Sequence, residues 1–200
     1  MTRQLIAILR GVYAQETVDI CNALIDAGIT QIEVPLNSPD PFDAITAALE
    51  ACKGRASIGA GTVTRLDEVA GLAKIGADFI VSPNCNPAVI AATKQAKMGS
   101  FPGVLTPTEA YQAIEAGADG LKLFPAGHLG PAGIAAMRAA LPPMDLYAVG
   151  GAGPDNFAEY RAAGCIGFGL GSFLYKPGAS AESVAAKAID AVKAFDALAE

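Results

Sequence analysis

Short apolar runs alternate with longer Ala-rich segments of helical period along the whole chain. This alternation is typical of βα units that surround a parallel sheet. The predicted strands cover residues 5–9, 32–35, 57–61, 79–82, 100–102, 120–124, 146–149 and 167–169, and the fifth has the weakest pattern. Helices are expected between them, for example over 88–97, 134–140 and 181–198. We therefore predict one α/β domain, residues 1–200, folded as a small (β/α)₈ barrel.

A repeat of helix-ending glycines supports the barrel. Each glycine follows a helical segment and precedes an apolar strand, and the repeat consists of Gly28, Gly76, Gly117 and Gly164. The separations of 48, 41 and 47 residues equal about two βα units each. The repeat therefore marks the second, fourth, sixth and eighth strands.

The repeat also predicts which residues share one level of the barrel. The fifth residues after the four glycines are Glu33, Val81, Lys122 and Gly169. Because one interior layer of such a barrel takes side chains from alternate strands, we predict that Glu33 and Lys122 share a layer. Gly169 would leave room for a ligand there. The flanking residues predicted to point outward, by strand alternation, are Ile32, Val34, Leu121 and Leu123.

Lys122 and Glu33 suggest imine chemistry if they are buried together. Burial lowers the pKa of a lysine and makes its amine nucleophilic near neutral pH, so that it can condense with a ketone. A neighbouring carboxylate can transfer the protons that imine formation and C–C cleavage require. Two alternatives stay open: Lys122 could be an exposed strand-edge residue, and the two could form a neutralising buried ion pair.

Glycines follow the seventh and eighth predicted strands, in Val149-Gly-Gly-Ala-Gly-Pro and Gly169-Leu-Gly-Ser. Backbone N–H groups in such turns can bind phosphate at the carboxyl-terminal rim of a barrel. The candidates are Gly150, Gly151, Gly171 and Ser172. These glycines could instead only permit tight turns, and their spacing does not match a dinucleotide-binding fingerprint.

Two further polar residues follow strands at the same rim. Arg10 comes after the first strand and could bind a carboxylate with two hydrogen bonds, and Thr62 comes after the third strand. The alternatives are a solvated charge for Arg10 and a helix N-cap for Thr62. His128 is the only histidine, and it lacks the companion ligands of a metal site.

Composition and charge argue against several classes of protein. The formal net charge of −6 argues against a nucleic-acid surface, and the apolar run at 5–9 is too short for a signal-peptide core or a membrane span. The four cysteines, Cys21, Cys52, Cys85 and Cys165, form no C-x-x-C pair. We expect a cytoplasmic protein without membrane or nucleic-acid partners.

The motifs Ile6-Ala-Ile-Leu-Arg-Gly, Ile32-Glu-Val-Pro, Gly59-Ala-Gly-Thr-Val and Leu121-Lys-Leu-Phe-Pro occur in this order. With them, nearly the whole chain resembles the 2-keto-3-deoxy-6-phosphogluconate/galactonate aldolase family. The resemblance implies a metal- and cofactor-independent lyase and a homotrimer. It implies that Lys122 forms the Schiff base, that Glu33 transfers protons and that Arg10 and Thr62 lie near the pyruvyl carboxylate. The residues it implies near the phosphate are Gly151, Gly171 and Ser172.

One position departs from the gluconate-type members of this family. They typically have Thr-Leu-Arg-Thr after the glutamate and valine, whereas this chain has Pro35-Leu-Asn-Ser. Asn37 makes the chain similar to the members that act on the galactonate epimer, whose products are pyruvate and D-glyceraldehyde 3-phosphate. We expect Asn37 to contact substrate hydroxyls beyond C3.

Three alternative functions remain open from the sequence. The chain could act on the 6-phosphogluconate epimer, or it could be a phosphate-binding barrel isomerase or epimerase, which has the same glycine-rich rim. It could also be a catalytically silent barrel that binds sugar phosphates, although such a protein has no reason to place Lys122 and Glu33 in one layer.

Overall fold

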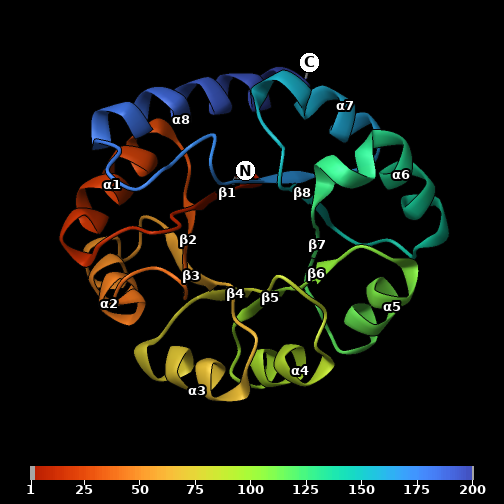
Figure 1. The fold of residues 1–200 in the computed structure, drawn as a ribbon, viewed down its shortest axis with the longest axis horizontal. Coiled ribbons are helices and arrows are strands. Elements are labelled where there is room, and N and C mark those ends of the chain that lie inside the picture. The colour runs from red at the N-terminus through yellow and green to blue at the C-terminus, as the bar shows by residue number, and fades with distance from the viewer. Residues whose placement is uncertain (1–2, 200) are drawn as a thin grey trace.

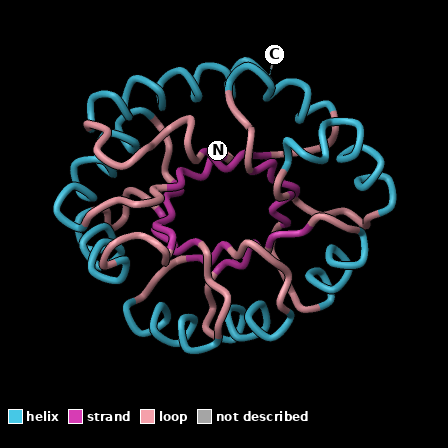
Figure 2. The backbone as a smooth tube through the Cα atoms, viewed as in Figure 1, coloured by secondary structure: helices cyan, strands magenta, loops and turns pink. Residues whose placement is uncertain are grey.

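A computed structural model describes residues 3–199; the ends of the predicted domain, residues 1, 2 and 200, lie outside the described residues. A ring of strands lies inside a ring of helices (Figure 1, Figure 2). The strands are β1 (Leu5–Ile8), β2 (Gln31–Pro35), β3 (Ser57–Gly61), β4 (Phe79–Val81), β5 (Gly99–Phe101), β6 (Gly103–Val104), β7 (Leu121–Leu123), β8 (Leu146–Val149) and β9 (Gly167–Leu170). The helices are α1 (Ala14–Ala27), α2 (Pro41–Ala51), α3 (Leu66–Ile75), α4 (Pro87–Gln95), α5 (Pro107–Glu115), α6 (Ala126–Ala140), α7 (Phe157–Ala162) and α8 (Ala181–Asp196). Two 3₁₀ turns are η1 (Pro154–Asn156) and η2 (Ala197–Ala199).

All strand pairs are parallel, in the order β5-β4-β3-β2-β1-β9-β8-β7-β6. Only Pro102 separates β5 from β6, so the chain itself joins the two ends of this order and closes the barrel. The predicted fifth strand, 100–102, is therefore wrong in its bounds. Pro102 has no N–H to donate and interrupts the ladder. The segment is still bonded on both sides, because Phe101 O accepts from Ser82 N and Pro102 O accepts from Lys122 N.

Apolar side chains form two separate clusters. The larger one fills the space between strands and helices, and it includes the four residues predicted to point outward, Ile32, Val34, Leu121 and Leu123. The smaller one fills the barrel interior with Ile6, Ile8, Phe79, Val81, Tyr147 and Val149. The predicted alternation of inward and outward positions is therefore confirmed.

The repeat of helix-ending glycines is confirmed as well. Gly28, Gly76, Gly117 and Gly164 have φ values of 100°, 82°, 94° and 104°, the left-handed conformation that ends a helix. The predicted helix 134–140 begins too late, since α6 starts at Ala126. A non-helical Gly130 (φ 64°, ψ 167°) followed by Pro131 interrupts this helix and obscures its first turns in the sequence. Among the described residues, no helix is long and apolar enough to cross a membrane.

Candidate functional site

Glu33 and Lys122 lie inside the barrel, on β2 and β7. Their side chains are only 2% and 6% exposed. Together with Val81 and Gly169 they line a small cavity in the interior. The predicted shared layer is therefore confirmed, and the strand-edge alternative for Lys122 is wrong.

Two glycines leave room in this layer. Gly169 lines the interior cavity, as predicted, and a Cβ atom there would lie 2.8 Å from Val149 Cγ2 and 3.4 Å from Ile8 Cδ1. A Cβ atom on Gly61 would lie 1.4 Å from Glu33 Oε2. Gly61, at the end of β3, therefore provides the space for the Glu33 carboxylate.

The Glu33 carboxyl group is buried without a fixed partner. Its Oε2 atom has no hydrogen-bond partner, and among residues 3–199 no ion pair within 4.0 Å joins it to Lys122. Burial raises the pKa of Glu33 to about 7, although the positive charges of Lys122 and Arg10 oppose this shift. A carboxyl group with this pKa can both accept and donate protons near neutral pH. The geometry does not support the neutralising ion pair.

The Lys122 amine is disposed to act as a nucleophile. Burial lowers the pKa of Lys122, the charge of Glu33 opposes this, and the charge of Arg10 adds to it. The Nζ atom lies 4.6 Å from the centroid of the Phe124 ring. A lysine with a lowered pKa has more of its amine in the neutral form that attacks a carbonyl.

Arg10, Asn37 and Thr62 come together at the carboxyl-terminal mouth of the barrel. Arg10 Nη1 donates to Asn37 Oδ1 at 2.5 Å and to Thr62 Oγ1 at 3.4 Å. Thr62 has a φ of 60°, which is strained for a β-branched residue and is typical of functional sites. The N-cap alternative for Thr62 is wrong, because Arg65 occupies the N-cap of α3.

A cleft of about 770 Å³ opens above Lys122. Six of the predicted residues line it: Arg10, Lys122, Gly150, Gly151, Gly171 and Ser172. Glu33 lines the small interior cavity and not the cleft, and the two spaces adjoin, since they share Lys122 and Gly169 as lining residues. Asn37 and Thr62 are not among its lining residues, but they contact Arg10, which is one.

Several residues that line this cleft were not predicted from the sequence, among them Phe124, Asn156, Tyr175 and Lys176. Asn156 carried a usable signal, because an asparagine three residues after a glycine can cap the turn between them. The other three carried none, because their approach to the cleft depends on the tertiary fold. His128 lies exposed in the first turn of α6 and does not line the cleft.

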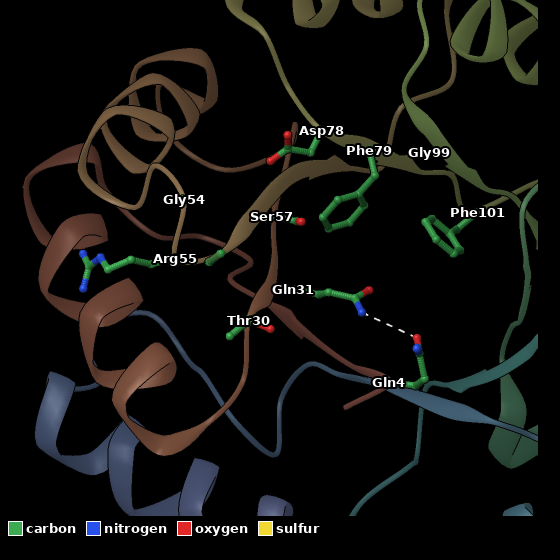
Figure 3. Close-up of a pocket in the computed structure, with 11 residues that line it drawn as sticks. Gln4, Thr30, Gln31, Gly54, Arg55, Ser57, Asp78, Phe79, Gly99 and Phe101 are labelled. Atoms are coloured by element: carbon green, nitrogen blue, oxygen red, sulfur yellow. Dashed lines mark hydrogen bonds between the residues drawn. The ribbon is translucent and has the colours of Figure 1, made fainter. Parts of the chain in front are cut away.

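The opposite, amino-terminal mouth of the barrel is also hollow, with a volume of about 670 Å³ (Figure 3). Gln31 Nε2 donates to Gln4 Oε1 at 3.5 Å, and Tyr147 Oη donates to the same oxygen at 2.7 Å. The labelled side chain of Arg55 points away from the centre of this mouth. No lysine lines this mouth, and its one carboxylate, Asp78, already accepts a hydrogen bond from Ile58 N at 2.7 Å.

Metal ligands do not gather in either mouth. Within the range 3–199, no three His, Cys, Asp or Glu side chains are grouped closely enough to hold a metal ion. The buried amine of Lys122 lines the cleft and the interior cavity, and the buried carboxyl of Glu33 lines the cavity, whereas Asp155 and Lys176, which also line the cleft, are exposed.

A model of one protein family, described as KDPG and KHG aldolase, matches residues 1–194. A probable 2-dehydro-3-deoxy-6-phosphogalactonate aldolase of Rhizobium meliloti (strain 1021) is 51% identical over 99% of this chain and 94% of its own length. The 2-dehydro-3-deoxy-6-phosphogalactonate aldolase of Escherichia coli (strain K12) is 45% identical over 96% of this chain and 94% of its own length. A solved structure described as native KDPGal superposes with a TM-score of 0.98 at 44% identity, covering 100% of this chain and 97% of its own.

Proposed function

The chain belongs to the KDPG and KHG aldolase family, and we propose that it cleaves 2-dehydro-3-deoxy-6-phospho-D-galactonate through a Schiff base on Lys122. The products are pyruvate and D-glyceraldehyde 3-phosphate. The observation that carries this proposal is the buried Lys122 amine in one layer with the unpartnered Glu33 carboxyl, at the floor of an open cleft. The names of the two relatives at 51% and 45% identity support the galactonate substrate.

Lys122 starts the reaction as the nucleophile. Its neutral amine adds to the C2 ketone, and the resulting carbinolamine loses water to give an iminium. The iminium accepts the electron pair of the C3–C4 bond as that bond breaks, and the C4 hydroxyl loses its proton to leave an aldehyde. The enamine that remains takes a proton at C3, and water then releases pyruvate and the free amine.

Glu33 moves the protons in these steps. Its pKa of about 7 lets one carboxyl group protonate the departing hydroxyl of the carbinolamine, accept the C4 hydroxyl proton and return a proton to C3. Since its Oε2 atom has no protein partner, no existing hydrogen bond has to break before it acts.

The two ends of the substrate bind on either side of this pair. Arg10, oriented by Asn37 and Thr62, binds the carboxylate next to the ketone. The turns that contain Gly150 and Gly151, and Gly171 and Ser172, bind the phosphate through backbone N–H groups. Binding energy from the remote phosphate then contributes to catalysis as well as to affinity.

We also propose that the protein acts as a homotrimer in the cytoplasm. The resemblance to the family supports the trimer, and the four free thiols, of which Cys21, Cys52 and Cys165 are buried, suit a reducing compartment. Sedimentation equilibrium measures the mass of the particle, and a monomer at micromolar concentration contradicts the trimer. Cell fractionation tests the compartment.

Trapping with pyruvate and borohydride tests the central proposal. We expect one reduced pyruvyl group per chain, located on Lys122 by peptide mass mapping. Cleavage should keep its full rate in excess chelator, because no proposed step uses a metal. An adduct on another lysine, or loss of activity with the chelator, would reject the mechanism.

Epimer comparison tests the choice of substrate. Asn37 Oδ1 accepts from Arg10, which leaves its amide N–H₂ group to donate to a substrate hydroxyl beyond C3. We expect a higher kcat/KM for the 6-phosphogalactonate epimer than for the 6-phosphogluconate epimer. A clear preference for the gluconate epimer would reassign the substrate while leaving the Schiff-base mechanism intact.

A further inference from the structure

The turn after β8 contains two backbone N–H groups that the protein itself does not use. Gly151 and Ala152 both line the cleft. Within residues 3–199, neither of their N–H groups donates a hydrogen bond to a protein acceptor. Ala152 as a whole residue is only 7% exposed. Two adjacent free N–H groups in a cleft form a site for an anion.

The carbonyl groups of this turn are held in place from outside the cleft. Gly150 O accepts from Gly127 N at 2.8 Å, and Gly151 O accepts from Asn156 Nδ2, also at 2.8 Å. Asn156 Oδ1 accepts in turn from Gly153 N at 2.9 Å. One asparagine side chain therefore bonds the turn at two points.

The planar peptide bond relates these carbonyls to the free N–H groups. In a trans peptide, the C=O of one residue and the N–H of the next point in opposite directions. Fixing Gly151 O on Asn156 therefore fixes the direction of the Ala152 N–H, and fixing Gly150 O on Gly127 fixes that of the Gly151 N–H. Gly150 and Gly151 have φ values of 84° and 92°, so this turn conformation requires glycine.

We propose that Asn156 is a positioning residue that holds the Gly151 and Ala152 N–H groups ready for the substrate phosphate, without itself bonding that phosphate. The inference rests on the proposed function and names the residue that organises its phosphate end. α7 has only six residues, so the turn and not the helix determines the direction of these donors.

Asn156→Ala and Asn156→Asp test this inference, with kcat/KM measured on the phosphorylated sugar acid and on its unphosphorylated form. Asn156→Ala should lower kcat/KM for the phosphorylated acid about tenfold, mainly through KM, and leave the other value unchanged. Asn156→Asp should lower it at least as much, because aspartate still accepts from Gly153 but cannot donate to Gly151 and repels an anion. Inhibition by inorganic phosphate should weaken by a similar factor in both variants.

Asn86→Ala is the matched control, because the Asn86 side chain also accepts from a backbone N–H, that of Ala88 at 3.1 Å, but Asn86 does not line the cleft. It should lower the Tm without changing the ratio of the two kcat/KM values. The pyruvate adduct on Lys122 should form at the wild-type rate in all three variants.

Retention of the wild-type preference for phosphate in Asn156→Ala would overturn the inference alone. Equal losses on both substrates would also overturn it, since they indicate a general structural role. A wild-type chain that forms the pyruvate adduct but cleaves both acids equally would overturn the phosphate assignment together with this inference. Absence of the adduct in the wild-type chain would reject the proposed mechanism instead.

Discussion

The two mouths of the barrel contain polar groups that are satisfied in opposite ways. At the amino-terminal mouth, Gln4 accepts hydrogen bonds from both Gln31 and Tyr147, so neutral groups satisfy one another. At the carboxyl-terminal mouth, Glu33 Oε2 is buried with no partner, and the Lys122 amine is buried without an ion pair within 4.0 Å in the described chain. The first arrangement stabilises the fold, whereas the second leaves ionisable groups available for a substrate.

The free-energy cost of burying an ionisable group explains why this difference between the two mouths indicates function. An ionisable group buried without a partner destabilises a protein, and such groups persist where chemistry needs them. A pair of glutamines bonded to a tyrosine carries no such penalty. Substitutions at the carboxyl-terminal mouth should therefore change activity more than stability, and substitutions at the amino-terminal mouth should do the reverse.

Lys122→Met should have the largest effect on activity. Cleavage and the pyruvate adduct should both disappear, because Lys176, the other lysine that lines the cleft, is exposed and is not buried beside Glu33. The Tm should stay the same or rise, since methionine fills a similar volume without a buried amine. Steady-state kinetics and thermal unfolding measure the two effects. Residual aldol cleavage in this variant would contradict the difference drawn between the two mouths.

Gly61→Ala should lower kcat about a hundredfold, within the range typical of a displaced general acid–base. The new Cβ would lie 1.4 Å from Glu33 Oε2, and the carboxyl group at the end of a flexible side chain should move while the backbone stays in place. Gly133→Ala is the control, because its Cβ would meet only Leu129 at an ordinary 3.7 Å. Wild-type kcat in Gly61→Ala would show that the position of the carboxylate is unimportant.

Glu33→Gln should change the pH dependence of stability. The folded pKa of about 7 exceeds the ordinary value of 4.5, so the folded state holds a proton that the unfolded chain has already lost. The unfolding free energy of the wild type should therefore fall as the pH rises from about 4.5 to about 7, by up to roughly 3 kcal/mol. Urea unfolding of both proteins across this window gives the difference curve. A flat difference would mean that Glu33 titrates normally.

Gln4→Met should leave kcat/KM unchanged and affect stability alone. It removes the acceptor of the Tyr147 hydroxyl, and an unpaired buried hydroxyl costs about 1 to 3 kcal/mol. Chemical denaturation measures the loss, and kinetics on the folded variant check the activity. A strong fall in kcat with little change in stability would assign a catalytic role to the amino-terminal mouth.

The layer that contains Lys122 and Glu33 could be predicted from the sequence because helix-ending glycines fix the start of each strand. The number of residues after the glycine gives the level that a residue occupies in the barrel. The alternation of side chains along a strand then tells whether that residue points into the barrel or toward the helices. The bounds of the fifth strand could not be predicted as well, since Pro102 divides five strand residues into runs of three and two, which are too short to give a pattern.

Contacts between segments far apart in the chain could not be predicted. Gly61 indicates only that a side chain is missing at this position. The neighbouring residues in the sequence do not show that the Glu33 carboxylate fills the space. The hydrogen bond from Arg10 to Asn37 likewise depends on the side-by-side pairing of β1 with β2. The hydrogen bond from Asn156 to Gly151 joins residues close in the sequence, but its importance depends on the position of this turn beside the cleft.

The repeat of helix-ending glycines has a consequence for protein engineering. Glu33 and Lys122 occupy equivalent positions of the repeat, but one belongs to the segment before α4 and the other to the segment after it. On the proposed mechanism neither half of the chain is a complete enzyme, and a duplicated half would place two lysines or two glutamates in the layer. If the two halves are expressed separately, aldol cleavage would report that they have assembled into one barrel with the native strand pairing. Of the two other equivalent positions, Val81 offers a place for a new ionisable group, whereas a side chain at Gly169 would meet Val149.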